Sequence, residues 1–180
     1  MPIWEQKYEC CPREELEQLQ LERLQSSLNR AYKNVAFYRR IFDQLKIVPE
    51  DIATRRDFEK LPFTTRRDLQ DNYPYGLFAV PLREVVRIHT TTETSTTPTV
   101  VGYTRNDLKN WANLVARFLT ASGVTDDDVI QVAFQYGLFT GAFGLHHGAE
   151  RIGASVIPSS SGNTRKQIRI MQDYRTTVIA

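Results

Sequence analysis

The last third of the chain alternates short apolar strands with helices, and this alternation constrains the fold more than any other feature. The pattern predicts buried strands at Asp128–Phe134, "ASVIP" and "TTVIA", separated by helices over residues 140–153 and 164–174. This order is typical of a parallel sheet with right-handed crossovers. We therefore expect an α/β fold containing the start of a parallel βαβαβ sheet.

The chain stops at Val178, Ile179 and Ala180, which are apolar and favour a strand. A central strand at the terminus would leave a sheet edge and apolar surface uncovered. We expect the chain to be the N-terminal piece of a longer protein or a truncated gene product.

The first 80 residues predict a helical layer. A long amphipathic helix should begin after Pro12, because apolar residues recur at helical spacing at Leu16, Leu19, Leu24, Leu28, Ala31 and Val35. A further helix should stop at Pro62, and Thr64 or Thr65 should cap the next one. We expect two parts, a helical segment over residues 1–80 and a partial α/β subdomain over residues 81–180.

Two short β-branched stretches, "EVVRIH" and "TVVGYT", predict a hairpin between residues 84 and 104. Thr104 and Asp107 have the spacing of a reciprocal helix cap, and Gly123 should end that helix. Its expected apolar stripe comprises Leu108, Trp111, Leu114, Val115, Phe118 and Leu119.

Composition excludes several classes of protein. A net charge of +2 and paired Arg–Asp clusters give no reason to expect nucleic-acid binding. The sequence contains neither an apolar run long enough to span a membrane nor a secretory signal, so we expect a cytoplasmic address. Cys10 and Cys11 are adjacent, which closes the ordinary disulfide geometry to them and predicts free thiols.

The hairpin connection, residues 90–97, contains only Thr, Ser and one Glu. Hydroxyls and free backbone N–H groups can surround an anion, which would make this segment a phosphate-binding loop. A solvated hairpin tip is the simpler interpretation, and composition alone favours it.

Three strings together resemble the phenylacetate–coenzyme A ligases, a branch of the acyl-adenylate-forming enzymes: "YKNVAFYRRIF", "IHTTTETSTTPTVVGYT" and "FQYGLFTGAFGLHHGAERIGASVIPSSSGNTRKQI". The resemblance runs along essentially the whole chain. It implies part of the large N-terminal domain of an enzyme that uses ATP with Mg²⁺ to activate an aryl acid as an acyl-adenylate and then transfers the acyl group to coenzyme A. It also allows a homodimer of the full-length protein.

The family's phosphate loop has the form S-S-G-T-T-G-K-P-T. By this resemblance Thr91, Thr92, Thr94, Ser95 and Thr99 are the cofactor-binding residues, and Pro98 matches outright. Glu93, Thr96 and Thr97 depart from it, replacing both glycines and the lysine. A carboxylate near polyphosphate costs on the order of a few kcal/mol, and the missing lysine about 1–3 kcal/mol more. We therefore expect weak ATP binding here.

The resemblance assigns the acyl pocket to Tyr136, Phe139, Gly141 and Ala142, whose small residues would leave room for a flat ring. Close packing at a strand-to-helix turn is the alternative interpretation of these four residues.

The three histidines are best interpreted as structural. His146 and His147 are neighbours on a helix and should diverge by roughly 100°, so we expect no shared metal ion. His89 precedes the hydroxyl-rich loop. "SSSGNT", residues 159–164, lies where α/β sheets bind ligands, but it reads equally well as a plain loop with Thr164 as the helix cap.

The expected function is that of an aryl acid–coenzyme A ligase, with partners limited to the aryl acid, ATP and coenzyme A. No catalytic residue is assigned to this stretch, which should complete neither half-reaction alone. The alternative is a non-catalytic relic or interaction subunit that keeps the fold without tight nucleotide binding. A P-loop phosphotransferase is disfavoured because the chain has no G-x-x-x-x-G-K-[ST] motif.

Overall fold

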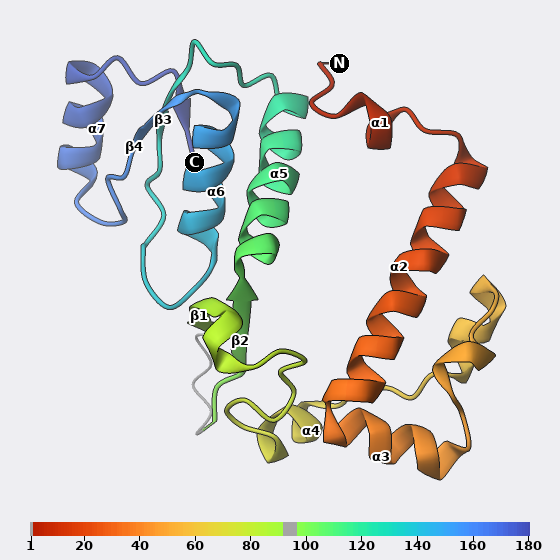
Figure 1. Cartoon of the computed structure of the whole chain (residues 1–180). Coiled ribbons are helices and arrows are strands. Elements are labelled where there is room, and N and C mark those ends of the chain that lie inside the picture. Colours follow the sequence, from red (N-terminus) through yellow and green to blue (C-terminus); the bar gives the residue numbers. More distant parts are fainter. Residues whose placement is uncertain (1, 92–96) are drawn as a thin grey trace.

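The structure is a computed structural model that describes residues 2–91 and 97–180. Figure 1 shows the helices of the N-terminal part on one side and the strands with helices α5, α6 and α7 on the other. The predicted α/β class, with a helical front segment, a hairpin and a parallel sheet, is confirmed. The division into parts at residue 80 stays a prediction.

The N-terminal part consists of short and long helices. They are α1 (Gln6–Glu9), α2 (Arg13–Asn34), α3 (Ala36–Leu45), α4 (Arg66–Asp71) and the 3₁₀ turns η1 (Pro49–Asp51) and η2 (Arg55–Lys60). Pro12 precedes α2 as predicted. Thr65 caps α4, because its hydroxyl accepts a hydrogen bond from the Asp68 N–H.

The apolar stripe of α2 is less buried than its periodicity suggests. None of the helix's residues is fully buried. The buried residues of this part instead gather where α2 ends and the chain turns into α3 and η1. They are Val35, Phe37, Phe42, Pro49 and Ile52. The helix is therefore fixed mainly at its C-terminal end.

The predicted hairpin is present. After a 3₁₀ turn η3 (Leu82–Glu84), strand β1 (Val85–Thr90) pairs antiparallel with β2 (Val100–Thr104). Helix α5 (Arg105–Ala121) follows directly, and the Thr104 hydroxyl accepts from the Asp107 N–H in the predicted capping box. Gly123, with φ of +96°, lies just beyond the end of the helix, as expected.

The parallel sheet is built from short strands in the order β4–β3–β5. Strands β3 (Val129–Gln131), β4 (Ser155–Ile157) and β5 (Val178–Ile179) alternate with helices α6 (Gly141–Ile152) and α7 (Thr164–Asp173). The expected strand from 128 to 134 is shorter than predicted. Beyond Gln131, one backbone hydrogen bond from Val132 to Ile157 and one from Ala133 to Ala180 continue the pairing, after which the chain leaves the sheet.

Helices α5 and α6 approach closely because α6 presents glycines to α5. A Cβ atom on Gly148 would lie 2.4 Å from Val115 Cγ1, and one on Gly144 would lie 2.7 Å from Trp111 Cζ2. The predicted α5 stripe is therefore only partly correct. Leu114 and Phe118 are 57% and 59% exposed.

One predicted cap is wrong. Asn163, not Thr164, caps α7, and its side chain accepts a hydrogen bond from the Lys166 N–H. Asn163 has φ of 49°, a conformation that asparagine tolerates better than threonine. Over the residues that the structure describes, no helix has the length and apolarity needed to cross a membrane.

Candidate functional site

The two ends of the hydroxyl-rich loop are joined by hydrogen bonds. The Thr91 N–H donates to the Thr99 carbonyl at 3.0 Å, and the Thr91 hydroxyl accepts from the Thr99 N–H at 3.0 Å. Thr91 and Thr99, predicted to bind the nucleotide, thus close the base of the loop. Thr97 lies in a bend just before Thr99.

The other residues predicted for the phosphate loop lie outside the described residues. They are Thr92, Thr94 and Ser95, together with the departures Glu93 and Thr96. Their assignment stays a prediction.

The four residues predicted for the acyl pocket occupy two environments. Tyr136 and Phe139 lie on the loop between β3 and α6, where Phe139 is 43% exposed and stacks on Phe134. Ala142 is fully buried in the core behind this loop. Gly141 is tightly packed, because a Cβ there would lie 2.9 Å from a ring atom of Phe134. The structure thus groups Tyr136 and Phe139 on one loop, while Gly141 and Ala142 pack beneath it.

This segment between β3 and α6, residues 134–140, is called the acyl loop below. It is tied to the hydroxyl-rich loop through one backbone carbonyl. The Leu138 oxygen accepts from the Thr90 N–H at 3.0 Å and lies 2.9 Å from His89 Nδ1. Because a carbonyl can only accept, His89 must carry its proton on Nδ1. Two segments about 50 residues apart in sequence, both predicted to bind ligand, therefore meet at Leu138.

His89 is 2% exposed and lies among aromatic rings. Its ring packs edge-on against Tyr103 and Trp111 and tilts against Phe143, with centroid separations of 5.7, 6.2 and 5.7 Å. Its Nε2 atom is buried and has no hydrogen-bond partner among the described residues. The expectation of a structural histidine fits the packing. The contact of His89 with the acyl loop was not predicted from the sequence.

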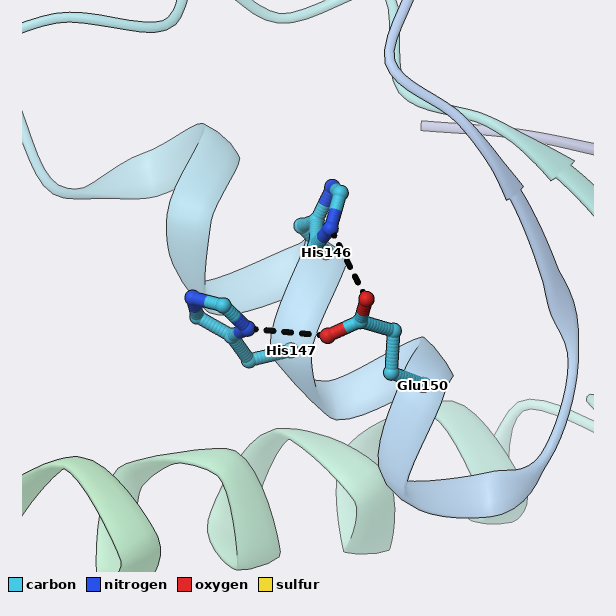
Figure 2. Close-up of side chains that lie close together, drawn as sticks. All are labelled: His146, His147 and Glu150. Carbon is cyan, nitrogen blue, oxygen red and sulfur yellow. Dashed lines mark hydrogen bonds and ion pairs between the residues drawn. The ribbon is translucent and has the colours of Figure 1, made fainter.

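His146 and His147 converge on one carboxylate, contrary to the expectation that they diverge. His146 Nε2 lies 3.1 Å from Glu150 Oε1, and His147 Nδ1 lies 3.0 Å from Glu150 Oε2. Figure 2 shows both imidazoles directed toward this side chain from the same helix. The prediction considered backbone directions only. Glu150 lies four and three residues further along α6, where its two oxygens reach both rings.

Each imidazole has a second partner on its far nitrogen. His147 Nε2 lies 3.1 Å from Arg87 Nη2, and His146 Nδ1 lies 3.1 Å from the Tyr136 hydroxyl. The Arg87 guanidinium also lies over the Phe143 ring, 5.0 Å from its centroid. A continuous chain of contacts therefore runs from β1, through α6, to the acyl loop.

The nitrogen and oxygen ligand atoms of His146, His147 and Glu150 all lie within 4.8 Å of one another, which is close enough to consider a metal ion. An ionised carboxylate only accepts hydrogen bonds and a guanidinium only donates them. The imidazole nitrogens that face Glu150 must therefore carry protons, and the His147 lone pair must point at Arg87. A metal ion bound here would have to displace the protons that the two imidazoles direct at Glu150.

The pKa shifts of Glu150 and Tyr136 agree with the hydrogen-bond directions around His146 and His147. The hydrogen bond from His147 lowers the pKa of Glu150. Burial, with a smaller contribution from the Glu150 charge, raises the pKa of Tyr136. Glu150 is thereby kept ionised and Tyr136 protonated near neutral pH.

The loop over residues 159–164 follows the carboxyl end of β4, as predicted. The Ser159 hydroxyl donates to the Val132 carbonyl at 3.1 Å, and the Ser160 N–H donates to the same oxygen. These serines hold the loop against the sheet.

Comparison with known proteins identifies close relatives. The chain is 52% identical over 166 residues to the phenylacetate–coenzyme A ligase of Escherichia coli (strain K12), which covers 92% of this chain and 38% of the relative. It is 46% identical over 178 residues to the enzyme of that name from Thermus thermophilus, covering 99% of this chain and 40% of the relative.

The chain is homologous to the phenylacetate–coenzyme A ligases. It spans about two fifths of the length of these relatives. None of the protein-family profiles matches the chain.

Solved structures give the same placement. A crystal structure of 2-hydroxyisobutyryl-CoA ligase in the postadenylation state, in complex with R3-HIB-AMP, matches with a TM-score of 0.87 and 28% identity, over 98% of this chain and 38% of that one. The same ligase in complex with 2-HIB-AMP and CoA matches with a TM-score of 0.81 and 30% identity, over 89% of this chain and 35% of that one. The predicted relationship to adenylate-forming ligases is thereby confirmed.

Proposed function

We propose that this chain is the part of an ATP-dependent aryl acid–coenzyme A ligase that carries the acyl loop and the phosphate loop. The observation that carries the proposal is the shared Leu138 carbonyl, which accepts from His89 and Thr90 at the foot of the hydroxyl-rich loop. An acyl-adenylate requires the carboxylate and the α-phosphate to meet, and these are the two loops that would hold them.

The acid we propose is phenylacetate or a related aryl acid. Tyr136 and Phe139 place two aromatic rings on the acyl loop, and Tyr136 packs edge-on against Phe143 at 5.3 Å. Aromatic side chains stabilise a bound ring by apolar burial and by edge-to-face contact. The names of the curated relatives favour the same acid.

The nucleotide is the partner that this chain should hold least well. Adenylation builds negative charge on the departing pyrophosphate, so fixed donors around it lower the barrier. In place of the family's glycines and lysine the sequence has Glu93, Thr96 and Thr97. Glu93 would repel phosphate, and Thr97 cannot supply a lysine's charge-assisted hydrogen bond. We propose weak ATP binding and no acyl–coenzyme A synthesis by these 180 residues alone.

Mg²⁺ would have to come with the nucleotide. It prefers carboxylate, phosphate and water oxygens. The described residues at the loop base, Thr91 and Thr99, offer hydroxyl and backbone oxygens that already bond to each other. They do not fit a protein-held magnesium ion. Coenzyme A enters only the second step, and we propose the cytoplasm and a homodimer as the setting of the full-length protein.

Calorimetry on the 180-residue chain tests both halves of the proposal. Phenylacetate should bind, and changing Tyr136 to Ala should abolish its heat of binding. ATP with Mg²⁺ should bind weakly, and the triple change Glu93→Gly, Thr96→Gly and Thr97→Lys should tighten it by at least about tenfold, equivalent to about 1.4 kcal/mol. Pyrophosphate release that depends on phenylacetate would contradict the proposed inactivity of the isolated chain.

A second candidate is a non-catalytic relic or interaction subunit, which the altered loop favours. Under that reading Glu93 and Thr97 record a loss of nucleotide binding. The triple change decides between the two hypotheses. If the changed chain binds both ATP and phenylacetate, the ligase hypothesis is supported. If it remains folded and binds neither, the non-catalytic relic is supported.

A further inference from the structure

We propose that Glu150 and His146 are positioning residues that hold the Tyr136 hydroxyl in one orientation at the acyl loop. The inference rests on the proposed function, because Tyr136 is assigned to the acyl pocket there. It starts from the side-chain hydrogen bonds that link α6 to that loop, from Glu150 through His146 to Tyr136.

The direction of each hydrogen bond follows from the Glu150 carboxylate, which can only accept, and the Arg87 guanidinium, which can only donate. Glu150 accepts, so His146 donates from Nε2. A neutral His146 then has its lone pair on Nδ1, and the Tyr136 hydroxyl at 3.1 Å must donate to it. Tyr136 is thereby left with its oxygen lone pairs free to accept a hydrogen bond from a ligand or water.

His147 forms the second arm of the same cluster. It donates from Nδ1 to Glu150 at 3.0 Å and accepts from Arg87 at 3.1 Å. With two neutral imidazoles and one ionised carboxylate, every contact in the five-residue chain pairs one donor with one acceptor. His146 and His147 should therefore be opposite tautomers, with the proton on Nε2 in the first and on Nδ1 in the second.

The adjacent residues His146, which contacts Tyr136, and His147, which contacts Arg87, allow a matched pair of variants. His146→Phe removes the acceptor for Tyr136, while His147→Phe keeps the ring that stacks on Phe143 and leaves the His146 arm intact. Glu150→Gln is a third variant. Its side chain is 54% exposed, so the change should not disturb folding.

The first measurement uses the 180-residue chain without ligand. The ¹⁵N shifts of the imidazole nitrogens should give opposite tautomers for His146 and His147, and the ring ¹³C shifts of Tyr136 should change in His146→Phe and Glu150→Gln but not in His147→Phe. Identical tautomers, or an unchanged Tyr136 in His146→Phe, would overturn the proposal.

The second measurement is phenylacetate affinity. A lost hydrogen bond in the positioning chain should weaken it about fivefold to tenfold in His146→Phe, and less than about twofold in His147→Phe. Equal losses in the two variants would contradict a positioning role. If the unmodified chain fails to bind phenylacetate, the proposed function fails, and the tautomers and Tyr136 shifts still decide whether the chain of hydrogen bonds exists.

Discussion

Helices α2 and α6 both have apolar residues at helical spacing, yet the structure buries them very differently. None of the 22 residues of α2 is fully buried, whereas four of the 12 residues of α6 are: Ala142, Gly144, Gly148 and Ala149. All four are small. Apolar spacing identifies a helix, but the small residues of α6 are what allow another backbone to approach closely enough to exclude water.

The largest expected difference is in the free energy of unfolding lost when a leucine is truncated in the core beneath α6 and on the partly buried face of α2. Leu119 of α5 is 4% exposed and packs in the core beneath α6, whereas Leu28 of α2 is only partly buried. Leu119→Ala should lower the free energy of unfolding by about 3 kcal/mol, and Leu28→Ala by about 1 kcal/mol. Urea denaturation measures both, and equal losses would remove the contrast between the core beneath α6 and the partly buried face of α2.

A smaller effect should come from adding one methyl group. Gly148→Ala places a Cβ 2.4 Å from Val115, whereas Gly137→Ala meets no atom within 4 Å. Overpacking should cost about 2 kcal/mol at Gly148 even after the gain in helix propensity, and the Gly137 variant should stay within about 0.5 kcal/mol of the parent. A neutral Gly148→Ala would mean that α5 and α6 can move apart at little cost.

Among polar contacts, too, removing a buried one should lower the free energy of unfolding more than removing an exposed one on α2. His89→Phe keeps the aromatic packing and removes the buried hydrogen bond to Leu138, which should cost about 1 kcal/mol and speed amide hydrogen exchange over residues 136–140. The exposed Arg13–Glu17 pair of α2 is the control, because Arg13→Gln removes a solvent-screened ion pair and should change the free energy of unfolding much less. Unchanged exchange in the acyl loop would contradict its attachment through His89.

The smallest expected effect depends on pH. The Thr177 hydroxyl and the Thr125 N–H donate to Asp128, and they lower the pKa of this carboxyl in the folded chain. Its contribution is therefore complete above the unfolded pKa of about 4 and is lost as the pH falls through the lower folded value.

Asp128→Asn should destabilise the chain by less than about 1 kcal/mol at pH 7 and flatten the loss of stability below pH 4. Glu14→Gln on α2 serves as the control for removing one exposed charge. Parallel pH profiles for Asp128→Asn and the parent would contradict this role of Asp128.

The sequence predicted the long helices, the hairpin and the parallel strands, because each depends on local periodicity and on caps such as Thr104 with Asp107. The helix expected to stop at Pro62 is instead the 3₁₀ turn η2. Partners across the fold were harder to predict. Leu114 and Phe118 share the apolar pattern of α5, yet both side chains are exposed. The small residues of α6 were the available signal, since close helix contacts require them.

The candidate site was predicted in outline only. Its loops were located, but the contacts that join them depend on a backbone carbonyl at Leu138 and on the charged residues Arg87 and Glu150. A carbonyl is present at every residue, so no pattern of side chains points to this one. Glu150 had a signal, because it follows two histidines at helical spacing.

The paired ends of the hydroxyl-rich loop matter for protein engineering. Because Thr91 and Thr99 bond to each other on both backbone and side chain, the points where this loop leaves and rejoins the hairpin are fixed by two hydrogen bonds. We therefore expect that the intervening residues can be exchanged as a unit between homologues without changing the strand register. Replacing residues 92–98 with the seven corresponding residues of a relative would be the smallest single exchange expected to raise the affinity of this chain for the nucleotide.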